Sequence, residues 1–363
     1  MTRVSMSSRR ARRRRRAAAL VTTVTVGVVI VAAVVGVFAF ALLRPDPSSV
    51  ATPVDSSPAP TPAVASSTVG PTPDASATVS STPEPPTLPA AQACDRETVL
   101  SVWAHPDDDI IFANPTISDA IAAGDCVRTV FVTAGDAGKG DGYVEARELG
   151  ILHAYNDMRG VDGLWDTTEV VLQTGLHARR LTPQGDPRVS VVFLRLPDGN
   201  ITGAGFASTG YATLGRLLDG EVPTLAPIGG GPAVSREQLL SSVTELTTGF
   251  HPSRLLTHIP RGSAFAPGDH PDHSVVGSIV RDTLSTDPAV GPGIRYFVGY
   301  PSRDLPRNLD GAILDAKVDT YRIYTQQDEV IRCADRAACL GTRNFGEWLR
   351  RSYPKTEAEL QID

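Results

Sequence analysis

Two short stretches place imidazole and carboxylate groups at spacings that suit metal chemistry. In the first, SVWAHPDDDIIF at 101–112, an apolar run ends in His105, followed by Asp107, Asp108 and Asp109. Burying unpaired charge costs several kcal/mol or more. The cluster is therefore either a solvated helix start, where carboxylates suit the helix dipole, or a site where a positive ion binds.

The second stretch, GDHPDHSVVG at 268–277, supplies His270 and His273. Imidazole and carboxylate groups from separate elements are typical ligands of a divalent metal. His105 and Asp108 are three residues apart across a proline expected to begin a helix, so their side chains face the same way. With His273 as the third ligand, two histidines and one carboxylate leave a position for water, as in catalytic zinc sites.

Such a site also needs groups that move protons. Zinc polarises a carbonyl and acidifies water. Asp107 is the candidate general base, and His270 is the candidate proton donor to the leaving group. Each motif alone also fits a structural role, because His105 could cap a strand and the aspartates could stabilise a helix start. Both motifs together favour the metal site. The remaining histidines are interpreted as structural: His153, His177, His251 and His258.

Strand and helix patterns alternate between residues 98 and 330. Apolar, strand-like runs occur at 98–104, 127–138 (ending in a glycine-rich loop), 191–200, 254–260 and 294–300. Helical patterns occur at 116–125, 143–160, 235–250, 273–284 and 309–330. This alternation predicts an α/β fold, a Rossmann-like, mostly parallel sheet flanked by helices. Ligands of such sheets bind beyond the carboxyl ends of the strands, where we expect the metal site.

Two common catalytic classes lack their motifs. The chain has no GxSxG nucleophile elbow and no GxxxxGK[ST] phosphate loop. The glycine-rich GDAGKGDG at 135–142 has the wrong spacing for a phosphate cradle and is interpreted as a mobile loop near the site.

The N-terminal quarter of the chain predicts a membrane anchor and a spacer. Residues 1–16 contain eight arginines and no acid, and 17–43 carry no charge. The apolar run is long enough to span a bilayer, and its basic flank places the N-terminus in the cytoplasm. Cleavage after FAFA is the alternative, and it leaves the rest on the same side. Residues 44–93, rich in Pro, Ser and Thr, predict a disordered tether.

Residues 94–363 then form an extracytoplasmic domain with a net charge of −11, which argues against nucleic acid as a partner. Its four cysteines predict two disulfides in an oxidising compartment. We expect the pairs Cys94–Cys126 and Cys333–Cys339.

The motifs AHPDDDIIF and GDHPDHSVVG resemble those of the PIG-L/LmbE-like family of zinc-dependent de-N-acetylases, which act on substrates bearing N-acetylglucosamine. VFVTAGDAGKG, AREL, AYNDMRGV and FLRLPDG follow in the family's order, so the resemblance covers roughly 98–276, with a looser match through YFVGY and the terminal helix.

The resemblance implies roles for individual residues. Zinc, one ion per domain, would be bound by His105, Asp108 and His273, with Asp107 as general base. His270 would protonate the departing amine or stabilise the oxyanion. Further roles are implied for two more residues: Asp272 would tune His270 as a neighbouring carboxylate, and Arg147 would contact the sugar.

The sequence departs from the family at two places. Asp109 stands where glutamate is common, and we expect it to lie behind the metal ligands. Gly268 stands where some relatives have a tyrosine that stabilises the tetrahedral intermediate, so the oxyanion stabiliser is unidentified.

Taken together, these features predict a cell-membrane, single-pass, extracytoplasmic zinc-dependent N-deacetylase. Its expected substrate is an N-acetylated amino sugar or cell-envelope glycan, cleaved by metal-activated water. Two alternatives stay open: a non-catalytic cell-surface carbohydrate-binding protein on the same fold, and an amidase for another N-acyl substrate.

Overall fold

The computed structural model describes residues 94–362. The predicted basic tail, membrane anchor and tether lie outside the described residues and stay predictions, as does the division of the chain at residue 94. Within 94–362, no helix combines the length and the apolar character needed to cross a bilayer.

One mixed sheet forms the centre of the described domain. Its strand order is β10-β9-β8-β1-β2-β5-β4-β3. The strands are β1 (Thr98–Trp103), β2 (Cys126–Thr133), β3 (Trp165–Val171), β4 (His177–Pro183), β5 (Val189–Leu196), β8 (Arg254–His258), β9 (Ile294–Phe297) and β10 (Pro354–Lys355). Strands β9, β8, β1, β2 and β5 run parallel; β10 pairs antiparallel with β9, β4 with β5, and β3 with β4. A short pair, β6 (Thr224–Leu225) and β7 (Val234–Ser235), lies apart from this sheet.

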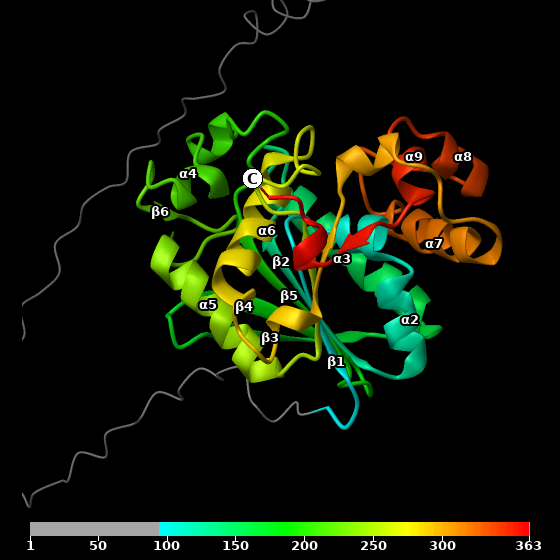
Figure 1. The fold of residues 1–363 in the computed structure, drawn as a ribbon, viewed down its shortest axis with the longest axis horizontal. Coiled ribbons are helices and arrows are strands. Elements are labelled where there is room, and N and C mark those ends of the chain that lie inside the picture. Colours follow the sequence, from blue (N-terminus) through cyan, green and yellow to red (C-terminus); the bar gives the residue numbers. More distant parts are fainter. Residues whose placement is uncertain (1–93, 363) are drawn as a thin grey trace, which may run out of the picture. The chain divides into compact units, whose positions relative to one another are not determined.

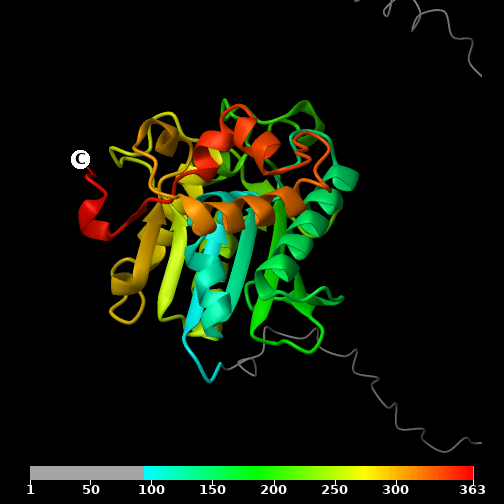
Figure 2. The same cartoon turned by 90° about the vertical axis from the view of Figure 1, so that its right-hand side faces the viewer.

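Helices cover both faces of the sheet and make three layers (Figure 1). One face carries α4 (Leu214–Leu218), α5 (Arg236–Phe250) and α6 (Pro271–Leu284). The other carries α2 (Thr116–Ala123), α3 (Asp141–Arg159) and α7 (Gly311–Tyr324), followed by the short α8 (Arg336–Gly341) and α9 (Phe345–Leu349). Figure 2 looks onto this second face, with α2, α3 and α7 in front of the strands. Each face buries its own apolar cluster.

The predicted α/β class is confirmed, and local sequence explains most of its elements. β1 and β2 are buried at every residue, as expected for central parallel strands. Gly124 and Gly160 end α2 and α3 in the left-handed conformation that glycine adopts without strain. Ser235 caps α5 through a capping box with Gln238.

Two expectations about elements are wrong. The hairpin β3–β4 was not predicted, because β3 is an edge strand with a single buried residue and β4 carries two arginines. The helix expected at 309–330 spans only Gly311–Tyr324, and α8, α9 and β10 follow it. Polar edge strands and short helices lack the apolar periodicity that identifies an element.

Both expected disulfides form, Cys94–Cys126 and Cys333–Cys339. The first attaches the start of the described chain to the beginning of β2, and the second closes the loop that leads into α8. No free cysteine remains within residues 94–362.

The sheet reverses its direction of winding between β1 and β8. From β1 the chain proceeds through β2 to β5 on one side, and β8 and β9 lie on the other. In open α/β sheets this switch creates a crevice beyond the carboxyl ends of the strands, where ligands bind. The residues that follow β1 and β8 therefore meet in one place.

Lys317 of α7 is buried, and its Nζ donates a hydrogen bond to the Arg351 carbonyl. Burial lowers the pKa of Lys317 to about 7. The unfolded chain therefore binds more protons between pH 7 and about 10.5, so this group makes the folded state more stable as pH rises through that window. We predict that Lys317→Met loses this dependence. The wild type should therefore gain on the order of 2 kcal/mol in its free energy of unfolding between pH 7 and 9, and the variant should lack this gain. A pH-independent difference would contradict it.

Candidate metal centre and active site

The loop after β1 folds as a tight turn. The Asp108 amide donates to the His105 carbonyl at 3.2 Å, and the His105 amide donates to Asp108 Oδ2 at 2.7 Å. Between them, Asp107 adopts a φ of 145°, which is unusual for a residue with a side chain and is found at sites held by their surroundings. A π-helix at Asp109–Ala113 follows. The expected proline-started α-helix is wrong, but the turn still brings the side chains of His105 and Asp108 together.

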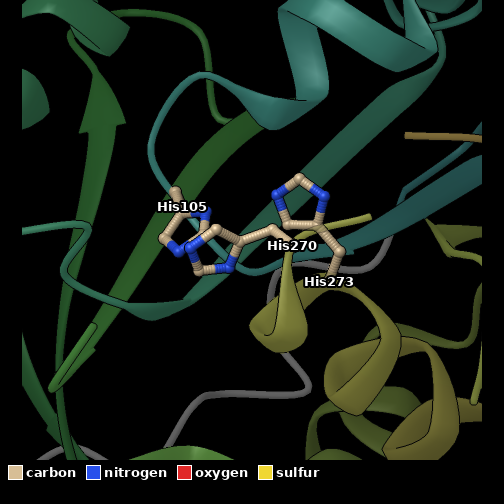
Figure 3. A group of neighbouring side chains, drawn as sticks. All are labelled: His105, His270 and His273. Carbon is tan, nitrogen blue, oxygen red and sulfur yellow. The ribbon is translucent and has the colours of Figure 1, made fainter. Parts of the chain in front are cut away.

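The start of α6 presents the second motif. His270 is the N-cap residue, and its Nδ1 accepts a hydrogen bond from the Asp272 amide at 3.2 Å. His273 lies in the first turn, and its Nδ1 lies 2.8 Å from Asp269 Oδ1. Figure 3 shows His270 and His273 at this helix start and His105 on the β1 loop, with their rings gathered together.

Asp108 lies between two of these rings. Its Oδ1 is 3.0 Å from His273 Nε2, and its Oδ2 is 3.2 Å from His105 Nδ1. All three side chains are buried, with Asp108 only 3% exposed. The three predicted metal ligands are therefore brought together from two elements 165 residues apart in sequence.

The hydrogen-bond partners decide which nitrogens carry protons. Asp269 accepts from His273 Nδ1, and Asp272 Oδ2, 3.3 Å from His105 Nε2, accepts from that nitrogen. If the rings are neutral, His273 Nε2 and His105 Nδ1 each carry a lone pair, and both nitrogens face the oxygens of Asp108. His273 Nε2 indeed has no hydrogen bond despite its buried position. Lone pairs and a carboxylate that face one another need a proton or a metal ion between them, so the residues fit a bound metal ion.

The electrostatics agree with a positive charge at this place. Burial disfavours the charge on Asp108, but the imidazoles, His273 first, outweigh burial and hold the pKa of Asp108 well below its ordinary range. Burial also opposes charge on His273, yet Asp108 and Asp269 raise its pKa to about 9. A metal ion can bind at His273 in place of this proton, because it is stabilised by the same neighbouring carboxylates.

Two further residues that could bind a metal ion lie next to the cluster. His258, at the end of β8, has its Nε2 3.2 Å from Asp108 Oδ2 and its ring stacked on that of His273. Asp198, after β5, has its Oδ1 3.8 Å from His270 Nε2. Metal-capable groupings of the buried donors are His105–His270–His273, His105–Asp198–His270–Asp272 and Asp108–His258–His273.

His258 and Asp198 were not identified as site residues from sequence. His258 was interpreted as structural because no acid or histidine lies near it in the sequence, although it ends a predicted strand. Asp198 belongs to FLRLPDG, a stretch noted only for resemblance. The signal that could have found both is their place at the carboxyl end of a parallel strand.

Asp107 faces the other side of the site, toward Arg147 of α3. Arg147 Nη2 lies 2.7 Å from Asp107 Oδ1 and donates to the Pro106 carbonyl at 2.9 Å. Its Nη1 donates to the Gly135 carbonyl and its Nε to the Tyr324 hydroxyl. Every nitrogen of Arg147 is thus engaged within the protein, so the geometry favours positioning of Asp107 over the expected sugar contact. Burial raises the pKa of Asp107 to about 7, and Arg147 opposes the shift.

Two other predicted residues lie behind the cluster. Asp109 is fully buried and accepts from the Tyr155 hydroxyl at 2.8 Å, away from the metal ligands, as expected. Asp272 Oδ2 lies 3.3 Å from His105 Nε2 but 4.0 Å from His270 Nδ1. Its closer partner is therefore His105, a metal ligand, and not His270. Gly199 donates its amide to the same oxygen, and a Cβ there would lie 2.3 Å from the carboxylate.

A cavity of about 140 Å³ opens onto these groups. One side is polar, with His105, Asp107, Asp108 and His270 among its residues. The other side is largely aromatic and comes from the C-terminal part of the chain. Its residues include Tyr300, Phe345 and Trp348, none of which the sequence marked as a site residue. The arrangement joins a metal-capable cluster, a buried carboxyl and a cavity with room for a small group.

Comparison with curated proteins finds no match. Among solved structures, N,N'-diacetylchitobiose deacetylase from Pyrococcus horikoshii is 16% identical, covering 64% of this chain and 71% of that one, at a TM-score of 0.38. The zinc-inhibited form of teicoplanin deacetylase is 14% identical, covering 63% and 84%, at 0.36. A 4-carboxy-2-hydroxymuconate hydratase from Pseudomonas putida KT2440 is 12% identical, covering 70% and 82%, at 0.39. These likenesses assign neither a substrate nor a residue.

A family model assigns the chain more directly. The model described as PIG-L, GlcNAc-PI de-N-acetylase, matches residues 100–284, just over half of the 363 residues. The matched range begins in β1 and ends with α6, so it contains both halves of the metal-capable cluster. Members of this family are metal-dependent N-deacetylases. The chain belongs to the PIG-L family and is a metal-dependent deacetylase.

Proposed function

We propose that this enzyme uses zinc to remove the acetyl group from an N-acetylated amino sugar, releasing acetate and a free amine. The observation that carries the proposal is the buried Asp108 carboxylate between His105 Nδ1 and His273 Nε2, at the wall of a cavity of about 140 Å³. Two imidazoles and one carboxylate are a catalytic zinc set. A zinc ion held by these residues would supply a Lewis acid that polarises the amide carbonyl and acidifies water.

Side chains of the enzyme would then accept and return the proton and bind the carbonyl oxygen. Asp107, held by Arg147, accepts a proton as water adds to the acetyl carbon. When the C–N bond breaks, the amine nitrogen takes that proton, and acetate leaves with the oxygen of the water. Neutral His270 carries its proton on Nε2, because Nδ1 accepts from the Asp272 amide. Of the two roles expected for His270, this tautomer supports hydrogen bonding to the carbonyl oxygen.

The substrate class and the location are parts of the same proposal. The uncharged run at 17–43, after a basic N-terminus, and the Pro-rich 44–93 support a tethered domain outside the membrane. The two disulfides are consistent with an oxidising compartment. The substrate we favour is therefore an N-acetylglucosamine unit of a cell-envelope glycan.

A binding protein without turnover and an amidase for another N-acyl group are the rival functions. The Arg147-held carboxyl of Asp107 disfavours the first, since sugar binding alone does not need a base. Metal analysis of the purified protein, combined with an acetate-release screen over N-acetylglucosamine conjugates, separates them. Bound zinc without release from any conjugate would support the binding protein. Release from other N-acyl amides alone would support the amidase.

The location can be tested in intact cells. If the domain lies outside the membrane, an added protease that cannot enter the cell should digest it, while a cytoplasmic marker protein stays whole. Digestion only after lysis would place the domain inside and refute this part of the proposal.

Replacing Asp107 by Asn should remove the base and retain the metal ligands. We expect acetate release to fall by roughly 10²–10⁴-fold. Zinc content, measured by metal analysis, should stay at the wild-type value because Asp107 is outside the proposed ligand set. Near-normal turnover would remove Asp107 from the mechanism.

Replacing His273 by Ala should instead remove a metal ligand. We expect stoichiometric zinc to be lost and turnover with it, since His273 Nε2 is one of the nitrogens that face Asp108. His153→Ala, on α3 and outside the cavity, is the matched control and should keep both zinc and activity. Full zinc content in the His273 variant would refute its role as a ligand.

A further inference from the structure

Tyr300 brings a phenol to the wall of the active-site cavity. It follows β9 and begins a short 3-10 turn at Tyr300–Asp304. Its side chain lines the same cavity as Asp107, Asp108 and His270. Its ring centroid lies 5.0 Å from that of His273 and 6.1 Å from that of His270. The ring of Tyr300 therefore lies close to the proposed metal ligand His273 and to the proposed carbonyl donor His270.

The position of Tyr300 is fixed by its neighbours. Its ring stacks on Trp348 with centroids 4.2 Å apart, and Trp348 Nε1 donates to the Tyr300 carbonyl at 3.0 Å. Its amide donates to Asp269 Oδ1 at 3.0 Å, the oxygen that also contacts His273 Nδ1 at 2.8 Å. At Gly299 a Cβ would lie 2.4 Å from the Asp269 carboxylate, so glycine allows this close approach. Asp269 thus links the backbone of Tyr300 to His273 on α6.

Tyr300 is half-buried, and its hydroxyl is unlike those of most of the fully buried tyrosines. Within residues 94–362, its backbone N–H and C=O are hydrogen-bonded but its hydroxyl has no protein partner. Four buried tyrosines donate to carboxylates: Tyr143 and Tyr324 to Asp328, Tyr155 to Asp109, and Tyr296 to Glu357. The Tyr321 hydroxyl is also unpaired, but its ring lies in the core and does not line the cavity. Tyr300 therefore lines the cavity and carries a hydroxyl without a partner among the described residues.

The reaction needs such a donor. As water adds, the carbonyl oxygen becomes negatively charged, and donors placed for that charge are worth more in a closed site than in water. His270 Nε2 supplies one. Gly268, two residues earlier, has no side chain to offer another. A phenol is protonated at neutral pH and is able to donate.

We propose that the Tyr300 hydroxyl donates a hydrogen bond to the oxygen of the attacked carbonyl and, with His270, forms the oxyanion-binding pair. The proposal rests on the deacetylase function proposed above. No proton is transferred: the O–H bond of Tyr300 persists, and its hydrogen bond strengthens as charge develops on the oxygen.

The kinetic test compares two tyrosine-to-phenylalanine variants. Tyr300→Phe keeps the stack on Trp348 and removes only the donor, so kcat for acetate release should fall roughly 10²–10³-fold with little change in KM. Zinc content and melting temperature should match wild type. Tyr321→Phe makes the same change at an unpaired core hydroxyl and should leave kcat within about twofold. Near-normal kcat in Tyr300→Phe, or a raised KM alone, would overturn the proposal.

Binding gives a readout without turnover. The probe is the methylphosphonamidate of glucosamine, whose tetrahedral phosphorus and charged oxygens resemble the intermediate. Calorimetry should show Tyr300→Phe binding this probe at least tenfold more weakly than wild type. In the Asp107→Asn background, the same change should barely affect binding of the N-acetyl compound. Equal affinity of wild type and Tyr300→Phe for the probe would overturn the role of Tyr300.

The two proposals fail in different ways. If wild type neither releases acetate nor binds the phosphonamidate, the deacetylation of amino sugars is refuted, and the role of Tyr300 with it. If wild type is active and Tyr300→Phe is equally active, only the role of Tyr300 is refuted.

Discussion

The carboxylate of Asp108 is the group on which the site depends. It is almost completely buried, and within residues 94–362 it pairs with imidazoles and with no lysine or arginine. A buried carboxylate without a cation is costly, and the imidazoles can neutralise it only by taking up protons themselves. A metal ion resolves this conflict, because one cation satisfies the carboxylate and two lone pairs together. The same cation is what amide hydrolysis requires.

The fold supplies these groups through one topological feature. Because the sheet changes its winding direction between β1 and β8, the loop after β1 and the start of α6 meet over the carboxyl ends of the strands. Carboxylates behind the site then orient the ligands. Asp269 accepts from His273, and Asp272 accepts from His105, which sets the tautomer of each ring. Arg147 performs a similar task for Asp107 from the opposite face.

The C-terminal part of the chain, beyond the range that the family model matches, completes the cavity. Trp348 of α9 supports Tyr300 by stacking and by a hydrogen bond, and both line the space beside the metal-capable cluster. The disulfide Cys333–Cys339 closes the loop that leads into α8, next to α9. The chemistry common to the family thus lies in one segment of the chain, and the aromatic wall of the cavity lies in another.

The sequence by itself determined the parts of this protein that are local. His105 with Asp108, and His270 with His273, are each close in sequence and come after expected strands, so residue type and spacing were enough to predict a metal site on a parallel sheet. The glycine ends of α2 and α3 and the Ser235 cap are local for the same reason. The cysteine pairs could be predicted because four cysteines allow few arrangements.

Only the tertiary structure decided what depends on distant partners. His258 and Asp198 have no chemical neighbours in sequence, and they join the cluster because parallel strands end at one edge. Arg147 turns inward because Asp107 and two carbonyls meet it there. Tyr300 reaches the cavity because Asp269 and Trp348, 31 and 48 residues away, hold it. Hydrogen bonds and packing between remote segments fix where a side chain points, and sequence spacing carries no record of them.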